Sequence, residues 1–263
     1  MLKVSDFDYF LPEELIASSP LTERDQSRLL VVQDDINGLL DLQFKQITDF
    51  IHADDLVVFN NSKVIKARLF GNKISGGKIE LLLERILPNN NLITHIRSNK
   101  KIPLGLEIEL ADTLVITVTK YLNGLFEVTP KNESINWLAY LEQHGHIPLP
   151  HYMKRNDTLD DELRYQTVYA KHAGSVAAPT AGLHFTPQLL DAITAKGAKC
   201  AYVTLHVGSG TFKPVTSTYV HEHKMHSELF SIDSVSADLI RKQQTAKKNI
   251  IAVGTTSLRT LEA

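Results

Sequence analysis

The middle of the chain alternates apolar and polar residues in runs bounded by turn residues. Three runs carry this pattern: residues 77–87, 105–110 and 114–128. The pair Asn123-Gly124 interrupts the last run and is typical of a type I′ hairpin turn. Such runs predict antiparallel strands, and no convincing helical pattern interrupts them. A compact barrel of roughly 70 to 85 residues fits, because closing the sheet removes its exposed edges.

Helical periodicity returns at residues 135–145, where Gly145 is expected as a left-handed helix terminator. Further on, Thr186-Pro187 predicts an N-cap and a first-turn proline for a helix that Gly197 ends. The apolar or alternating segments in the two flanking parts are expected to be strands, separated later by helix 236–248; these strands are 27–33, 39–44, 55–61, 200–207, 228–232 and 249–254. Alternation of helices with buried strands favours a largely parallel sheet.

These patterns predict an α/β fold with an inserted antiparallel β-barrel. The expected domains are a discontinuous α/β catalytic domain, residues 1–62 and 151–263, and an inserted barrel domain, residues 63–150. Residues 254–263 read as the first turns of a helix without a terminating cap, so we expect the chain to be a fragment truncated at its C-terminus.

Composition narrows the class of protein. The chain has 263 residues, 43% of them apolar and 22% charged, which is ordinary globular composition. Cys200 is the one cysteine, so an internal disulfide or a cysteine-based metal cluster is excluded. The first residues lack a signal-peptide pattern, and no apolar run approaches the roughly 20 residues that cross a bilayer. We therefore expect a cytoplasmic protein without a membrane partner.

The net charge of -2 conceals an uneven distribution. Residues 1–55 hold 12 acidic and 4 basic side chains, whereas residues 63–101 hold 9 basic and 2 acidic ones. The second segment is suited to meet a polyanion, although a solvated polar face explains the charge equally well.

Three histidines crowd the segment His221-Glu222-His223-Lys224-Met225-His226. Their spacing does not match a zinc helix of the His-Glu-x-x-His type, and on a strand His226 would point away from the other two. A metal site, a hydrogen-bonded surface loop, and acid–base work by His226 with Glu228 all remain open.

Three loops at strand ends carry small or hydroxyl residues that let a ligand approach the backbone. They are residues 175–187 with His184, residues 204–214 with two glycines, and residues 252–259 with Arg259 one turn into a helix. Open α/β sheets bind ligands at such strand ends, and a helix start suits a carboxylate. Packing corners would explain each loop singly, but the three support one another.

Two further segments carry polar groups near predicted strand ends. Arg24, Asp25 and Arg28 read most simply as an ion-pair network. Asn60 and Asn61 end a strand, and Lys63, Lys66 and Arg68 follow on the approach to the barrel, where solvation of a strand face is the plainer explanation.

Six segments together resemble one known family, the S-adenosylmethionine:tRNA ribosyltransferase-isomerases of queuosine biosynthesis. These segments are RDQSRLLVV, VVFNNSKVIKARLFG, RYQTVYAKHAGSVAAPTAGLHFT, VTLHVGSGTFKPV, HKMHSELF and AVGTTSLRTLEA. The resemblance covers nearly the whole chain in order. Two departures exist: His151 and Met153 replace a usual proline and isoleucine, and the family continues past this terminus through an Asn-Phe-His-Leu-Pro stretch, so the active site is expected to be incomplete here.

The resemblance implies an α/β domain with an inserted barrel. It also implies an enzyme that transfers and rearranges the ribosyl part of S-adenosylmethionine onto 7-aminomethyl-7-deazaguanine in tRNA. The products are epoxyqueuosine-tRNA, adenine and methionine. S-adenosylmethionine is then a co-substrate, and no metal or further cofactor is expected. A base, a proton for the departing adenine, and contacts to the methionine end suffice.

Roles for individual residues follow from the strand-end reasoning and the resemblance together. The acid–base candidates are His184, His206, His226 and Glu228. The substrate-binding candidates are Arg24, Arg28, Asn60, Asn61, Pro179, Thr180, Gly182, Gly208, Gly210, Thr211, Thr255, Thr256 and Arg259. The candidates for binding the tRNA anticodon arm are Lys63, Lys66, Arg68, Arg97, Lys100 and Lys101.

Two alternatives come from other classes. One is a metal-dependent hydrolase that uses the loop with His221, His223 and His226, and the other is a non-catalytic RNA-binding protein in which the barrel acts alone. A conventional methyltransferase is disfavoured because its glycine-rich first loop is missing.

Overall fold

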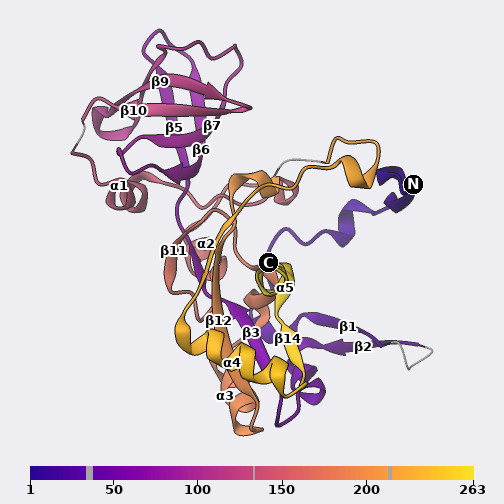
Figure 1. Ribbon diagram of the computed structural model, residues 1–263. Helices are drawn as coiled ribbons and strands as arrows, with labels where there is room; N and C mark the ends of the chain where they lie inside the picture. The colour runs from indigo at the N-terminus through magenta and orange to yellow at the C-terminus, as the bar shows by residue number, and fades with distance from the viewer. Residues whose placement is uncertain (34–37, 133, 213–214) are drawn as a thin grey trace.

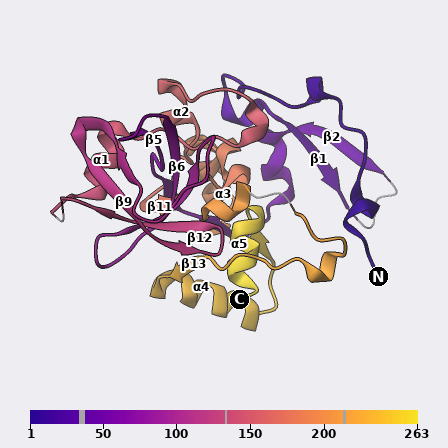
Figure 2. The ribbon, with the colours of Figure 1, turned by 90° about the horizontal axis from the view of Figure 1, so that it is seen from above.

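The computed structural model describes residues 1–33, 38–132, 134–212 and 215–263 (Figure 1). A β-barrel forms one body, and a four-stranded sheet with its helices forms the other. Figure 2 shows the barrel and the β1–β2 hairpin on opposite sides of the region around α3 and α5. The predicted fold class, an α/β domain with an inserted barrel, is confirmed.

The barrel is closed by six strands in the order β10-β7-β6-β5-β8-β9, all paired antiparallel. Their bounds are β5 Arg68–Lys73, β6 Lys78–Ile86, β7 Leu92–Arg97, β8 Glu107–Glu109, β9 Val115–Leu122 and β10 Leu125–Pro130. Alternate residues of β6, namely Ile79, Leu81 and Leu83, are buried inside. Asn123 and Gly124 both have positive φ, as a type I′ turn requires, so the predicted hairpin is confirmed.

Helix α1 (Trp137–His144) packs Trp137, Tyr140 and Leu141 against the barrel core. The expected left-handed terminator is wrong: Gly145 has φ -83° and ψ 165°, which is extended backbone. Its glycine identity has another cause, since a Cβ there would lie 2.1 Å from the carbonyl oxygen of Lys66. Close approach of two backbone segments at the base of the barrel therefore requires this glycine.

The sheet of the second body has the order β13-β12-β3-β14. The strands are β3 Leu56–Asn60, β12 Lys199–His206, β13 Leu229–Ile232 and β14 Ile250–Ala252. Strand β3 is parallel to both β12 and β14, whereas β13 is antiparallel to β12. The sheet is therefore largely parallel, with an antiparallel edge strand.

Helices cover both faces of this sheet, because alternate residues of the buried strand β3 point to opposite sides. Val57 and Phe59 pack on α3 (Pro187–Ala195), whereas Leu56 and Val58 pack on α4 (Ser234–Thr245). Thr186 caps α3 by accepting a hydrogen bond from Leu189 N, and Gly197 follows the helix with φ +92°. Both predicted ends of α3 are thus confirmed.

Shorter elements complete the body. The hairpin pairs β1 (Arg28–Val32) with β2 (Leu39–Gln43), and a second small sheet pairs β4 (Ser62–Val64) with β11 (His172–Ser175) in parallel. The remaining α-helices are α2 (Leu159–Arg164) and α5 (Gly254–Leu261). The 3-10 turns are η1 Val4–Phe7, η2 Glu13–Leu15, η3 Arg24–Gln26, η4 Phe44–Phe50, η5 Ala111–Thr113, η6 His151–Met153, η7 Thr180–His184, η8 Ser209–Phe212 and η9 Val220–Glu222.

Candidate active site

A pocket of about 360 Å³ opens where three loops meet at one rim of the sheet. The loops follow β11, β12 and β14, and each was predicted from strand-end reasoning. Their contributions to the lining are Ala177 to Ala181, Val207 with Thr211 and Phe212, and Gly254 to Thr256. The expected convergence of three turns far apart in the chain is therefore present in the structure.

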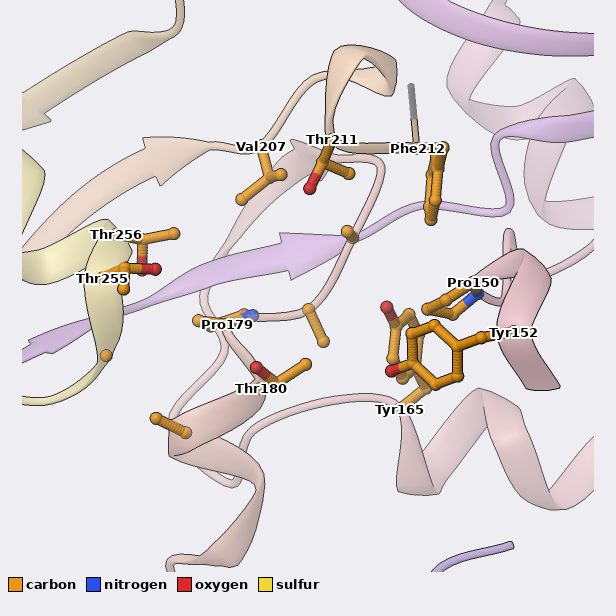
Figure 3. A pocket seen from close by; sticks show the side chains of 14 residues that line it. Pro150, Tyr152, Tyr165, Pro179, Thr180, Val207, Thr211, Phe212, Thr255 and Thr256 are labelled. Carbon is orange, nitrogen blue, oxygen red and sulfur yellow. The ribbon is translucent and has the colours of Figure 1, made fainter. Parts of the chain in front are cut away.

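The two ends of this pocket differ in character. Figure 3 shows Tyr152 and Tyr165 beside Pro150 at one end, and Thr255 with Thr256 at the opposite end. Val207 and Thr211 lie along one side between them, with Pro179 and Thr180 along the other. One end is therefore aromatic and the other rich in hydroxyl groups, which suits a ligand with a flat ring and a polar tail.

The hydroxyl end coincides with the start of α5. Thr256 Oγ1 is buried without a hydrogen-bond partner in the part of the chain that the structure describes, and so is Ser257 Oγ. The first backbone N–H groups of a helix have no partner within the helix and carry partial positive charge. This end can accept an anionic group from a ligand.

At the aromatic end, burial raises the pKa of Tyr165 to about 12, opposed by a backbone hydrogen bond with Ala178. Tyr165 is therefore a neutral phenol near pH 7. The chain is stiff on this side because Pro179 follows two buried alanines, Ala177 and Ala178. The small residues leave room for a planar group beside the tyrosines.

The turn η8 (Ser209–Phe212) forms one wall of the pocket and is fastened to the barrel. Ser209 donates hydrogen bonds to Glu84 Oε2 from its backbone N–H, at 2.7 Å, and from its hydroxyl. Gly208 allows this approach, since a Cβ there would lie 2.9 Å from Glu84 Oε1. The barrel thus positions a wall of the pocket.

His226 reaches the same turn from the other direction. A Cβ on Gly210 would lie only 2.4 Å from His226 Cδ2, so the imidazole rests against that glycine. Arg259 Nη1 forms a 2.6 Å ion pair with Glu228 Oε2, and Arg259 Nη2 donates to the His226 carbonyl at 2.6 Å. The predicted grouping of His226, Glu228 and Arg259 is present, but Arg259 holds Glu228 rather than a ligand carboxylate.

His184 and Arg24 lie in a neighbouring cavity of about 440 Å³. This cavity shares Tyr152, Tyr165 and Thr180 with the first pocket. Burial, followed by the charge of Arg24, lowers the pKa of His184, and a backbone hydrogen bond with Arg24 opposes the shift. His184 is therefore a neutral imidazole near pH 7, next to the pocket but outside its lining.

Arg24 was predicted to bind substrate, yet its guanidinium is occupied by the protein. It donates to the carbonyl oxygens of Leu163, Arg164 and Leu183. Arg28 lies elsewhere, in an exposed ion pair with Asp41 on the β1–β2 hairpin. Neither side chain lines the three-loop pocket, and we do not retain either as a ligand for the methionine carboxylate.

His206 faces a different environment from its neighbours. Leu205 and Val207 belong to the apolar cluster under the pocket, whereas the ring of His206 packs against Gly174. Burial, and then the proximity of His172, lowers the pKa of His206. We do not retain His206 as an acid–base candidate.

The two asparagines at the end of β3 brace the sheet. Asn60 Nδ2 donates to the Leu205 carbonyl, and its Oδ1 accepts from the N–H groups of Leu205 and Ser62. Asn61 Oδ1 accepts from the hydroxyl of Thr204. These internal bonds consume the polar groups that were predicted to bind substrate. Gly182 is likewise structural, because a Cβ would lie 2.1 Å from the Tyr169 hydroxyl.

The candidate RNA-binding residues divide into two groups. Lys63, Arg97, Lys100 and Lys101 are exposed. Lys66, by contrast, pairs with Glu162 at 3.0 Å and Glu142 at 3.5 Å, and Arg68 is buried beside Glu80. Burial acts to lower the pKa of Lys66, but the two carboxylates outweigh it and the pKa is raised. Lys66 and Arg68 therefore anchor the base of the barrel and are removed from the RNA-binding set.

The three clustered histidines do not gather around a point. His221 lies near the Tyr219 ring, with centroids 5.8 Å apart, while His226 rests on Gly210. No group of three or more histidine, cysteine or carboxylate side chains among the described residues is arranged to hold a metal ion. No helix in the same described part is long and apolar enough to cross a membrane.

Sequence reasoning missed several residues of the site. Tyr152, Tyr165 and Phe212 line the pocket, and Glu84 fastens its wall. Glu84 lies 125 positions from Ser209 and sits in a regular strand pattern, so no local signal marks it. Tyr152 could have been suspected, since it follows the proline-rich segment that returns the chain from the barrel.

Comparisons with known proteins agree with one another. A family model described as "Queuosine biosynthesis protein" matches residues 4–263. An S-adenosylmethionine:tRNA ribosyltransferase-isomerase of Francisella philomiragia is 50% identical over 261 residues, covering 99% of this chain and 77% of that protein. Proteins of the same name from Herminiimonas arsenicoxydans and Coxiella burnetii are each 47% identical, covering 100% and 99% of this chain and 76% of each relative.

A solved structure is also similar in sequence. The S-adenosylmethionine tRNA ribosyltransferase of Thermotoga maritima is 28% identical to this chain, with a TM-score of 0.45. The similarity covers 98% of this chain and 72% of that one.

Proposed function

This chain belongs to the queuosine biosynthesis protein family, and we propose that its three-loop pocket binds S-adenosylmethionine for transfer of the ribosyl group to tRNA. The chain is a transferase and isomerase, a tRNA ribosyltransferase-isomerase of queuosine biosynthesis. In the reaction, the ribosyl part of S-adenosylmethionine is moved onto 7-aminomethyl-7-deazaguanine in tRNA and rearranged. Epoxyqueuosine-tRNA forms, and adenine and methionine are released.

The observation that carries the proposal is the meeting of three strand-end loops around a pocket with an aromatic end and a hydroxyl end. S-adenosylmethionine has the same polarity, with a flat adenine at one end and an amino acid at the other. We place adenine beside Tyr152 and Tyr165, where stacking is favourable. The methionine carboxylate then lies at the start of α5, where Thr256 offers an unpartnered hydroxyl.

The cationic sulfonium would lie between these ends. Side chains that line the pocket in the described part of the chain are apolar, aromatic or hydroxyl-bearing, and none is an ionised group. A positive charge in such surroundings keeps its acidifying effect on the neighbouring carbon, because no carboxylate neutralises it. That carbon can lose a proton to a base, after which adenine departs by elimination.

His226 is the base that the geometry favours, since its ring rests on Gly210 in the wall of the pocket. Glu228 acts indirectly: paired with Arg259, it helps to hold the segment that carries His226. Unperturbed imidazole has a pKa of about 6.5, which suits proton transfer near neutrality. His184, neutral in the adjoining cavity, is the second candidate and can serve the adenine end.

The second substrate is tRNA, and we propose that its anticodon arm meets the exposed basic residues of the barrel. Arg97, Lys100 and Lys101 lie together at the end of β7 and in the loop that follows it. Phosphates bound by such side chains release counterions, so affinity should fall with salt. A cytoplasmic location, where tRNA is found, is part of the same proposal.

The test is to mix the protein with S-adenosylmethionine and tRNA that carries 7-aminomethyl-7-deazaguanine, and to assay free adenine by chromatography. Adenine release that requires both substrates supports the proposal. Binding of tRNA without binding of S-adenosylmethionine would contradict it and favour a non-catalytic RNA-binding protein. Loss of activity on treatment with a chelator, with recovery on adding a transition metal, would favour the metal-dependent alternative.

A further inference from the structure

A second cavity, of about 380 Å³, lies on the barrel side of the turn η8. Ser209 and Phe212 of the turn border it, and the rest of its lining comes from β6, β7 and the residue that follows β7. Phe212 lines this cavity and also the S-adenosylmethionine pocket. Two ligands bound in the two cavities would therefore be separated by one side chain.

The barrel face of this cavity is built by outward-pointing residues of paired strands. Glu80 lies opposite Arg97 in the register, and Leu82 lies opposite His95. Residues directly opposite in an antiparallel pair share a face of the sheet. A carboxylate, a guanidinium and an imidazole thus surround an apolar patch next to the ring of Phe212.

Glu80 is held in place but remains accessible. Its Oε1 lies 3.2 Å from Arg68 Nε, an ion pair without hydrogen-bond alignment, and its side chain is 25% exposed. Arg68 is fixed in turn by a hydrogen bond to the Leu149 carbonyl. A buried arginine therefore orients a partly exposed carboxylate toward the cavity.

We propose that this cavity receives the precursor nucleobase of tRNA, flipped out of its loop, and that Glu80 pairs with its protonated aminomethyl group. This inference rests on the proposed function, because a ribosyl transfer needs both substrates in adjoining sites. The amine distinguishes the precursor from guanine, and a carboxylate is the complementary group. Phe212 offers a ring on which the base can stack, and enzymes that modify bases bind them unstacked from the nucleic acid.

Arg97 has a different role in the same cavity. It is exposed at the end of β7, beside the basic residues Lys100 and Lys101. A guanidinium at the mouth meets the phosphates that flank a flipped nucleotide, which are the same in every tRNA. Glu80 therefore supplies selectivity for the precursor, whereas Arg97 supplies affinity for any tRNA.

The experiment compares the binding of two tRNAs, identical except that one carries 7-aminomethyl-7-deazaguanine and the other guanine at the target position. The wild-type protein, Glu80→Gln, Arg97→Met and the control Glu109→Gln are titrated with each tRNA and with S-adenosylmethionine. Glu109 is an exposed carboxylate on β8 of the same barrel and does not line the cavity. Thermal unfolding of each variant verifies that it is folded.

We expect Glu80→Gln to reduce the preference for the precursor by at least about fivefold, with S-adenosylmethionine binding unchanged. Arg97→Met should weaken both tRNAs equally, and Glu109→Gln should behave as wild type. A folded Glu80→Gln protein with wild-type preference overturns the inference. If Glu80→Gln does not fold, Phe212→Leu decides: weaker binding of both substrates supports the shared wall, and an effect on neither or only one overturns it.

Failure of the inference can be told from failure of the proposed function. A wild-type protein that releases adenine, with selectivity that Glu80→Gln leaves intact, disproves only the assignment of the cavity. A wild-type protein that neither binds S-adenosylmethionine nor releases adenine disproves the proposed function, and the inference falls with it.

Discussion

Glu84 on the barrel accepts two hydrogen bonds from Ser209, one from the backbone N–H and one from the hydroxyl, with a single carboxylate oxygen. Ser209 is 1% exposed, so both donors would lose their partner in a buried place if the carboxylate were removed. This contact links the barrel, which is the proposed tRNA-binding body, to a wall of the proposed S-adenosylmethionine pocket. It makes the pocket dependent on a residue that does not line it.

Replacing Glu84 with alanine should weaken S-adenosylmethionine binding by about tenfold and lower the free energy of unfolding by about 2 kcal/mol. The physical reason is that the freed turn no longer holds Thr211 and Phe212 in the pocket wall. Isothermal titration and urea unfolding measure the two effects, with Glu109→Ala as the control on the same barrel. Wild-type affinity in a folded Glu84→Ala protein would show that η8 is positioned by other contacts.

The hydroxyl of Thr256 offers a sharper probe of the pocket. Thr256→Val keeps the shape of the side chain and removes a buried oxygen that has no partner in the described protein. We expect S-adenosylmethionine affinity to fall about 5- to 10-fold while the free energy of unfolding is unchanged or slightly increased. Thr194→Val, on the exposed surface of α3, is the matched control. Reduced stability with normal affinity would mean that the hydroxyl serves the fold.

A third prediction concerns proton transfer. His226→Ala should lower the rate of adenine release by about 10²- to 10⁴-fold, the range that a positioned acid–base group supplies, with S-adenosylmethionine binding retained. His221→Ala is the control, because His221 is an exposed histidine of the same segment beside Tyr219. Should both variants turn over like the wild type, proton transfer would have to be assigned to His184.

Backbone-level features of the fold were predictable because short sequence signals determine them. The alternation in residues 77–87 predicted a barrel strand, Asn123-Gly124 predicted its hairpin, and Thr186-Pro187 predicted the start of α3. The meeting of three loops was also predictable, since the carboxyl ends of parallel strands in one sheet lie at one edge. These rules depend on local patterns and general geometry, both of which are readable from sequence.

Side-chain partners across long sequence distances were not predictable. Asn60 spends its amide on Leu205, 145 positions away, and Lys66 spends its charge on Glu142 and Glu162. Nothing near Asn60 or Lys66 in the sequence separates a structural polar group from one that awaits a ligand. Gly145 failed for a similar reason, because its need for space arises from the distant Lys66 backbone and not from its own turn.

Acid stability provides a fourth prediction. Arg155 donates two hydrogen bonds to Asp161 and, as the largest cause, holds the pKa of that carboxyl below its usual 3.8. Because the folded pKa is depressed, the contribution to stability is complete above about pH 4 and is lost as the pH falls through the folded value. Asp161→Asn should therefore lower the free energy of unfolding at pH 7 by about 3 kcal/mol and flatten its decline below pH 4.

Urea unfolding at pH 7 and at several values below pH 4 measures this difference. Asp238→Asn is the control, because its ion pair with Arg241 is exposed on both sides and should contribute little. An equal loss of stability for Asp161→Asn at every pH would assign the effect to packing of α2 rather than to the charge of Asp161.

The last prediction concerns the tRNA surface and separates the exposed cations from the paired ones. Lys100→Glu with Lys101→Glu should weaken tRNA binding and reduce the salt dependence of the binding constant, because about one counterion is released for each phosphate contact. Lys247→Glu, at the far end of α4, is the control and should leave both quantities unchanged. Affinity is measured by fluorescence anisotropy across a series of salt concentrations. Lys66 supplies the contrast: its charge is already balanced by Glu142 and Glu162, so Lys66→Met should lower stability while leaving the salt dependence unchanged. A steep salt dependence that survives the double charge reversal would place the tRNA on another face.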